Sequence, residues 1–325
     1  MAENNITLIE KNSFKDIYQS IINISHNSLE TIQPKSFENC VNITVLDLSF
    51  NKLKNFSKNV FDETTFATNF QLSHNYLTNL AQVSKKKTFH FVFIVHFVNF
   101  SFQIPLQNMT GLKMLNASHN NITQIPKNSF PKLYELHTID LSHNNISFIF
   151  NAVFQSLFSL RTVDLSYNSL QEVKSSMFGT LPTLLSLDLS YNQLENIVRG
   201  AMAKLTSLRF LNLNHNRLSK LFQIPISLNE LHMSDNQIES IPAGTWPVMN
   251  SLIYLDLSRN RLGDSLEQHS FTGLLVLQKL FLQENGITRP PLECLAGMST
   301  LQYLYMQVNV LLIIISNYHL ISIFL

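Results

Sequence analysis

Asparagine returns along this chain at a nearly constant interval. Thirteen asparagines form one series, and eight of the twelve intervals between them are 24 residues long. A unit of that size cannot bury its own apolar side, so the period predicts repeats that stack into a continuous core. The series comprises Asn4, Asn27, Asn51, Asn75, Asn120, Asn144, Asn168, Asn192, Asn216, Asn236, Asn260, Asn285 and Asn309.

Each asparagine lies within one apolar pattern, L-x-x-L-x-L-x-x-N-x-L, which is that of the leucine-rich repeat. Around Asn144 the apolar positions are filled by Leu136, Ile139, Leu141 and Ile146. The alternating x-L-x-L-x segment predicts a short strand with one buried face, and successive strands should pair in parallel, about 4.8 Å apart. We expect an α/β fold: a right-handed solenoid over residues 1–307 with about 12 to 13 repeats. Its parallel sheet should line the concave face, opposite an irregular or short-helical convex side.

The pattern also assigns scaffold roles. The side-chain amide of each asparagine should satisfy turn backbone that is otherwise unpaired. The strand leucines Leu141, Leu165, Leu189 and Leu257 should be buried, and Asp140, Asp164, Asp188 and Asp256 should be exposed. A bulky residue ten positions after the asparagine should form a spine under the convex side. The spine consists of Phe14, Phe37, Phe61, Phe130, Phe154, Phe178, Met202 and Trp246.

One interval is far too long, since Asn75 and Asn120 are 45 residues apart. Removing Val83–Gln103 restores a spacing of 24 and places Leu106 in the spine. We interpret this Phe-rich segment as a retained intron, because Gln82, Val83 and Ser84 can be encoded by a splice-donor sequence. The alternative is a degenerate repeat with Asn99 in its turn. A membrane span is disfavoured, because the apolar run is short and contains two histidines.

The two ends of the chain depart from the repeat as well. Residues 308–325 form an apolar tail that we interpret as read-through rather than a transmembrane helix, because Asn317 and His319 interrupt it. The chain starts inside a repeat, and neither a signal peptide nor an anchor is visible. We therefore expect a fragment of a longer solenoid.

Composition argues against several functional classes. The net charge of +1 gives no basic face for nucleic acid, and eight glycines make no phosphate-binding loop. Cys40 and Cys294 are too few for a disulfide framework and are expected to be buried, inert thiols. Histidines such as His119 and His143 precede the asparagines as part of the repeat, and we do not interpret them as metal ligands. The sequence predicts no enzyme, no cofactor, no metal site and no small-molecule substrate.

Glycosylation sequons favour the secretory route. They occur at Asn5, Asn23, Asn42, Asn55, Asn108, Asn116, Asn121 and Asn145, with Asn99 inside the suspected insert. All precede Asn168, so the later repeats are the better candidate for an open contact surface. There, aromatic residues at outward strand positions are candidate partner contacts. These are Phe210, Tyr254, Phe281, Tyr303 and Tyr305.

Three stretches carry a more specific resemblance: "NNITQIPKNSFPKLYELHTIDLSHNNI" at 120–146, "IPAGTWPVMNSLIYLDLSRNRLGDSLEQHSFTGLLVLQKL" at 241–280, and "GMSTLQYLYM" at 297–306. They resemble the chaoptin-like family of leucine-rich-repeat adhesion proteins of photoreceptors. The resemblance implies a glycosylated protein on the extracellular face of the plasma membrane. Its partner would be another copy of itself on an apposed membrane. A Toll-type receptor ectodomain that recognises a ligand and an intracellular repeat scaffold are the alternatives.

Overall fold

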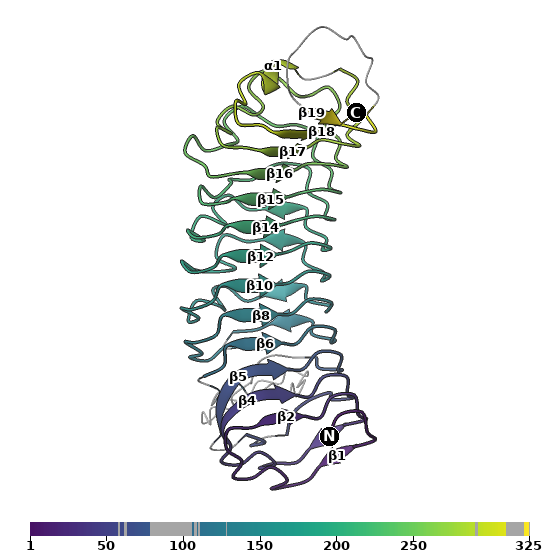
Figure 1. The fold of residues 1–325 in the computed structure, drawn as a ribbon, viewed down its shortest axis with the longest axis vertical. Coiled ribbons are helices and arrows are strands. Elements are labelled where there is room, and N and C mark those ends of the chain that lie inside the picture. The colour runs from purple at the N-terminus through teal and green to yellow at the C-terminus, as the bar shows by residue number, and fades with distance from the viewer. Residues whose placement is uncertain are drawn as a thin grey trace, which may run out of the picture. The chain divides into compact units, whose positions relative to one another are not determined.

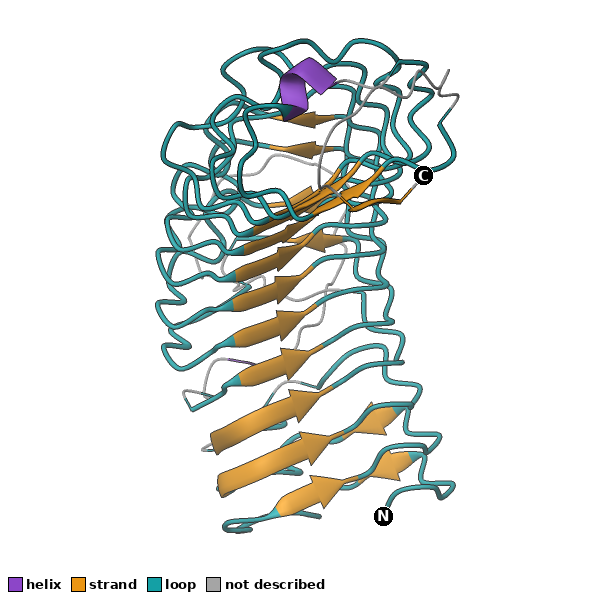
Figure 2. Cartoon of the chain, turned by 45° about the horizontal axis from the view of Figure 1, so that its top comes forward, coloured by secondary structure: helices purple, strands orange, loops and turns teal. Residues whose placement is uncertain are grey.

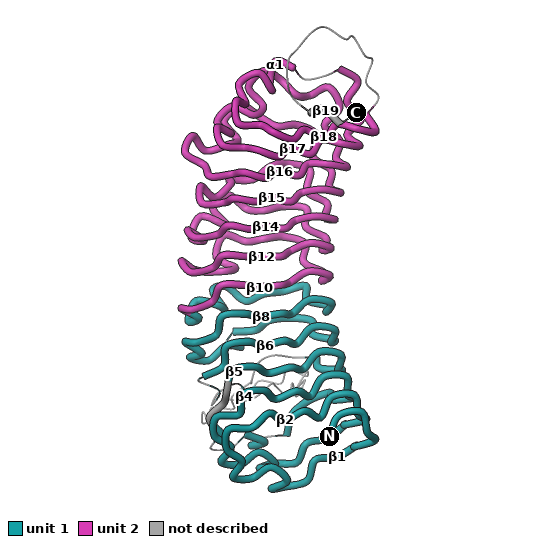
Figure 3. Tube along the Cα trace, viewed as in Figure 1, with its two compact units in different colours: residues 1–157 teal, residues 158–325 magenta. Residues whose placement is uncertain are grey.

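The computed structural model describes residues 1–57, 59–61, 64–78, 106, 109, 111–127, 129–289, 292–309 and 322–324, the last segment and residues 65–67 by backbone alone. The chain divides into two compact units, Met1–Leu157 and Phe158–Leu325 (Figure 3). Each unit is described separately below.

The first unit is built around a parallel sheet in which each repeat adds one strand. Its neighbouring strands are β2 (Ile21–Asn23), β4 (Val41–Asp47), β5 (Thr65–Gln71), β6 (Met114–Asn116) and β8 (Thr138–Asp140). Two smaller parallel pairs follow the turns: β1 (Leu8–Ile9) with β3 (Thr31–Ile32), and β7 (Gln124–Ile125) with β9 (Phe148–Ile149). Figure 1 shows the sheet strands following one another in chain order.

The second unit continues the same plan. Its sheet contains β10 (Thr162–Asp164), β12 (Ser186–Asp188), β14 (Phe210–Asn212), β15 (Glu230–His232), β16 (Tyr254–Asp256), β17 (Lys279–Phe281), β18 (Tyr303–Tyr305) and β19 (Ser322–Phe324). A small parallel pair joins β11 (Glu172–Val173) and β13 (Asn196–Ile197). Among the described residues the only helix is α1 (Leu292–Leu295), drawn purple in Figure 2. The predicted parallel-sheet solenoid is confirmed, and what the structure describes of its far side is irregular rather than helical.

Burial follows the repeat. Leu141, Leu165, Leu189 and Leu257 have no exposed surface, as predicted. The spine is also buried from Phe37 to Trp246, although Phe14 is only half-buried. Phe37 packs between Phe14 and Phe61, with ring centroids 4.9 and 5.2 Å apart. Leu106 is 1% exposed, in agreement with a spine role.

The prediction for the aspartates was wrong. Asp140, Asp164, Asp188 and Asp256 are half-buried rather than exposed. Asp140 Oδ1 accepts hydrogen bonds from the backbone N–H of Ser142 at 3.0 Å and from its hydroxyl at 2.7 Å. The carboxylate thus closes the turn after the strand, which is a local use of Asp that periodicity alone does not reveal.

The turn asparagines have their predicted role. Asn144 Nδ2 donates to the carbonyls of Ala117, Leu141 and Ser142 at 3.0 to 3.1 Å. Its Oδ1 accepts from the backbone N–H of Ile122, one repeat earlier, at 3.0 Å. One buried amide therefore satisfies four backbone groups and links two coils.

The long interval behaves as a single repeat step in the sheet. Although Asn75 and Asn120 are 45 residues apart, β5 pairs directly with β6, with Phe70 opposite Leu115. The N–H of Leu77 donates to Asn120 Oδ1 at 2.9 Å, the same link that joins other neighbouring repeats. The predicted insert, Val83–Gln103, lies outside the described residues, as do Asn99 and most of the tail. No helix in the described ranges combines the length and apolar character of a membrane span.

Candidate functional site

The strands of the second unit present two outward columns of side chains. In β14 through β18, the middle residue is a leucine with at most 1% exposure, for example Leu255. The first and third residues therefore point away from the core, because side chains alternate along a strand. Parallel pairing in register then aligns these outward residues from one strand to the next.

Rings from five successive strands form a continuous aromatic row on this face. Measured from β14 to β18, the centroid distances between successive rings are 5.1, 4.5, 4.9 and 4.4 Å. Such distances lie in the range in which aromatic side chains attract each other beyond simple burial. The aromatic row consists of Phe210, His232, Tyr254, Phe281 and Tyr305.

Four of the five predicted contact residues lie in the aromatic row. They are half-buried rather than fully exposed, because each ring covers part of the next. Tyr303 lies beside the row with 40% of its surface exposed, and Lys279 Nζ is 5.7 Å from its ring centroid. His232, which was not among the predicted contact residues, connects Phe210 to Tyr254. The available signal was that His232 replaces the aspartate that closes the turn in other repeats.

Three of the five repeats that carry the aromatic row have neither Asp nor Asn at the position that closes the turn after the strand. Where other repeats have Asp-x-Ser, these have His232-x-Ser234, Phe281-x-Gln283 and Tyr305-x-Gln307. The Oε1 atoms of Gln283 and Gln307 are buried and have no hydrogen-bond partner among the described residues. A buried polar atom left unpaired costs about 1–3 kcal/mol. Departures of this kind from a repeat pattern are expected where a surface serves binding rather than stability.

Charges of both signs border the aromatic row. Glu230 and Lys279 occupy the first positions of β15 and β17, on either side of Tyr254. Burial, followed by the carboxylates of Asp256 and Glu230, raises the pKa of Tyr254 to about 12. Its phenol is therefore protonated at physiological pH, and polar and charged residues form the rim of the aromatic row.

A second series of rings stands at the turns, directly before the asparagines. In the first unit His26, Phe50, His74, His119 and His143 stack with centroids 4.0 to 4.2 Å apart. In the second unit Tyr167, Tyr191 and His215 continue the pattern at 4.0 Å. All have positive φ near 50°, which turns the side chain outward at the corner of the coil. The rings lie face to face, so nitrogens of neighbouring histidines do not converge on one point.

The thiols belong to the scaffold. Cys40 and Cys294 are buried thiols, and burial raises the pKa of each to about 11. Neither is therefore a thiolate at neutral pH. In the ranges described, no cluster of three or more His, Cys, Asp or Glu side chains is arranged to hold a metal ion.

The described sequons all lie in the first unit. Asn5, Asn23, Asn42, Asn55, Asn121 and Asn145 have exposed side chains. Asn116 is half-buried on β6, and its Oδ1 accepts from Ser118. Asn108 lies outside the described residues. Whether any sequon carries a glycan stays a prediction.

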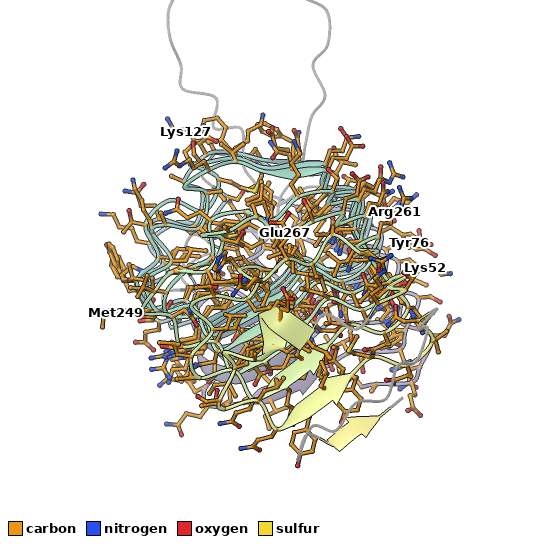
Figure 4. All side chains as sticks on the ribbon, turned by 90° about the horizontal axis from the view of Figure 1, so that it is seen from above. Lys52, Tyr76, Lys127, Met249, Arg261 and Glu267 are labelled. Atoms are coloured by element: carbon orange, nitrogen blue, oxygen red, sulfur yellow. The ribbon has the colours of Figure 1, made fainter. Side chains whose placement is uncertain are left out.

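The second unit also exposes an apolar flank before the strands. Val248 and Met249 are 78% and 85% exposed, and Figure 4 shows Met249 projecting from the ribbon. Ile226 and Leu275, on the preceding and following repeats, are each 61% exposed. Exposed large apolar residues on consecutive repeats add to the interaction capacity of this unit.

The family comparison agrees with the repeat pattern. The model described as "Leucine rich repeat" matches residues 20–77, 110–170 and 158–218, more than half of the chain. A second model, also described as a leucine-rich repeat, matches residues 248–265. No curated protein sequence matches the chain.

Solved structures share the fold at low sequence identity. Toll in the Drosophila Toll–Spatzle complex has a TM-score of 0.74 and 20% identity, covering 94% of this chain and 40% of that one. The leucine-rich-repeat domain of APL1 has a TM-score of 0.67 and 19% identity, covering 94% and 73%. The TLR13–ssRNA13 complex has a TM-score of 0.60 and 20% identity, covering 89% and 48%. The chain thus spans less than half the length of the Toll and TLR13 chains.

Proposed function

We propose that this chain, which belongs to the leucine-rich-repeat family, is a non-enzymatic protein-binding module of a cell-surface protein that mediates homophilic cell–cell adhesion. The single observation that carries the proposal is the aromatic row from Phe210 to Tyr305. Rigid aromatic side chains bordered by polar residues are the usual anchors of protein interfaces. The row extends along successive strands, which suits a broad protein partner better than a small ligand.

The charge pattern supports self-association. Glu230 and Lys279 flank Tyr254 on the two adjacent strands. A two-fold axis along β16 would bring Glu230 of one copy against Lys279 of another, as an isologous contact requires. Each contact need not be strong, because many copies on two apposed membranes add their affinities.

The sequon distribution supports the same face and the extracellular location. Sequons occur in the first unit, while residues after Asn168 contain none. Glycans would therefore leave the sheet face of the second unit open to another protein. A mobility shift after endoglycosidase treatment of the protein from its native source tests this location. An unshifted protein would favour the intracellular scaffold.

Recognition of a different protein ligand is the second candidate. Its supporting observation is the shared fold with Toll, which forms a complex with Spatzle. The same aromatic row would then contact another protein rather than a second copy. The two candidates differ in whether the chain binds itself.

Aggregation of beads coated with the chain separates these possibilities. We expect wild-type beads to cluster and beads bearing Tyr254→Ser with Phe281→Ser to remain dispersed. The matched control is Tyr167→Ser with Tyr191→Ser, which removes two stacked rings from the turns of the same unit. Dispersed wild-type beads would rule out homophilic adhesion by this chain. Full clustering by the Tyr254 and Phe281 variant would rule out the row as the contact.

A further inference from the structure

One repeat of the second unit is shorter than its neighbours. Asn216 and Asn236 are 20 residues apart instead of 24. The link between repeats is kept, since the N–H of Leu218 donates to Asn236 Oδ1 at 3.0 Å. The sheet register is kept as well, with Leu211 opposite Leu231. The missing residues are therefore taken from the part of the coil away from the sheet.

That part of the coil is where the spine residue belongs. Met202 in the preceding repeat is 2% exposed, and Trp246 in the following repeat is 3% exposed. The equivalent position of the short repeat, ten residues after Asn216, is Ile226, which is 61% exposed and fills no spine position. A groove of about 860 Å³ lies here, lined by three successive repeats. Its walls include Ile197, Arg199, Leu221, Phe222, Pro242 and Pro247.

A strand edge opens onto this groove. β13 pairs with β11 in parallel, and the N–H of Val198 donates to the carbonyl of Val173 at 2.9 Å. In the described part of the chain this small sheet ends at β13, because the short repeat adds no third strand. Ile197 of β13 also lines the groove. An unpaired strand edge beside a groove is suited to pairing with an extended peptide.

The groove is positively charged. Arg199 and Lys220 line it, and no carboxylate does. The nearby Glu195 lies outside the lining, 3.8 Å from the guanidinium of Arg217. Leu221 and Phe222 supply half-buried apolar surface in the same lining. The complementary ligand therefore combines apolar side chains with acidic groups.

We infer that this groove binds an extended segment of a partner protein that combines acidic and large apolar residues. The groove residues belong to the segments after the turn asparagines, β13 included, and not to the strands that carry the aromatic row. The site is thus independent of the proposed adhesive contact.

A labelled peptide tests the assignment directly. The probe is the fluorescein-labelled hexapeptide Glu-Asp-Leu-Phe-Asp-Glu, and its anisotropy is measured against the purified wild-type chain. We expect saturable binding that weakens as salt is raised, because exposed charges are screened. The same peptide with Gln and Asn in place of its acidic residues should bind at least about tenfold more weakly.

Two variants locate the binding to the groove. Arg199→Glu with Lys220→Glu should weaken binding by about tenfold or more, because it reverses both groove charges. The matched control is Lys174→Glu with Lys204→Glu, which changes the net charge by the same amount at exposed lysines outside the groove lining. Ala243→Trp should block the groove sterically without altering its charge. Ala243 is an exposed lining residue, so the fold should tolerate the larger side chain.

Three results would overturn the inference. The first is no binding of the peptide to the wild-type chain at about 1 mM, which is the weakest affinity that we would assign to a specific site. The second is that the charge-reversed variant binds the peptide as tightly as the wild type does. The third is that the uncharged peptide binds as tightly as the acidic one. Bead clustering by Ala243→Trp reports separately on adhesion. We expect it to match the wild type, so that failure of one proposal is distinguishable from failure of the other.

Discussion

Asn144 is hydrogen-bonded to Ala117, 27 residues earlier in the chain: its side-chain Nδ2 lies 3.0 Å from the Ala117 carbonyl oxygen. The equivalent bond joins Asn51 to Ile24 at 2.9 Å and Asn260 to Met233 at 2.9 Å. The fold is therefore held by a repeated link between coils in addition to apolar stacking. Loss of one link leaves buried backbone groups without a partner.

Replacing Asn144 tests this link. Asn144→Ala should lower the free energy of unfolding by about 1–3 kcal/mol, because buried carbonyls and the N–H of Ile122 lose their partner. Chemical denaturation of the unglycosylated protein measures the change. Asn145→Ala is the control, since that side chain is exposed. Equal effects of the two substitutions would mean that the buried amide has no special structural role.

The spine predicts a larger effect. Phe154 is fully buried and stacks on Phe130 with centroids 5.3 Å apart. Phe154→Ala should lower the free energy of unfolding by about 3–5 kcal/mol through lost burial and the cavity left behind. Phe150→Ala removes a ring that is 36% exposed and should have a much smaller effect in the same denaturation experiment. Similar values for both would contradict the assignment of the spine.

The aspartate contact predicts an effect that depends on side-chain chemistry. Asp140→Ala should destabilise the chain by about 1 kcal/mol, because Ser142 loses the acceptor of two hydrogen bonds. Asp140→Asn should retain most of the stability, since Asn116 bonds to Ser118 in the same way. Denaturation midpoints for the two variants provide the test. If Asp140→Ala is neutral, the turn does not depend on this contact.

The stacked histidines predict a pH dependence. Partial burial, followed by neighbouring histidines, lowers the pKa of His74 and of His119, while Asp140 opposes the effect at His119. At pH values between the lowered pKa of these histidines in the folded chain and their ordinary pKa near 6.5, the unfolded chain binds more protons than the folded chain. This contribution to stability is therefore present above pH 6.5 and is lost as pH falls through the lowered pKa.

Denaturation at pH 7.5 and at pH 5 measures that loss. His119→Phe with His74→Phe should reduce it, because Phe50 occupies the same column between His26 and His74 without a titratable group. The double variant should retain the wild-type stability at the higher pH. An unchanged difference between the two pH values would show that other groups cause the acid sensitivity.

Because β5 pairs directly with β6, we predict that the segment Val83–Gln103 between them is dispensable for folding. A variant without Val83–Gln103 should keep its circular dichroism spectrum, because the Leu77 to Asn120 bond and the strand register involve none of the deleted residues. Loss of cooperative unfolding on deletion would assign the segment to the scaffold. Transcript sequencing tests its proposed origin, and retention of the segment in every mature message would contradict a retained intron.

The repeat pattern predicted which side chains are buried in the core, but it did not predict many of the contacts between side chains on the surface. Leu141, Asn144 and Phe154 were assigned correctly, because an apolar or amide side chain at a fixed repeat position occupies the same buried site in every coil. The position of His232 between Phe210 and Tyr254 depends on the stagger of outward side chains across strands. A single repeat pattern does not contain that information.

The sequence contains a sign of the groove, but the groove was not predicted from it. The interval of 20 residues before Asn236 shows that something is missing from one repeat. It does not show whether the sheet or the spine loses residues. Pairing of Leu211 with Leu231 and exposure of Ile226 decide that question in the structure.

Self-binding by the purified chain tests the central claim most directly. Wild-type chain in solution should bind wild-type chain immobilised on a biosensor surface, with a response that saturates with concentration. Tyr254→Ser with Phe281→Ser on either partner should abolish the response, because both faces of the contact use the aromatic row, while Tyr167→Ser with Tyr191→Ser should leave it intact. No response from the wild-type pair, or an undiminished response after loss of Tyr254 and Phe281, would contradict homophilic binding through this surface.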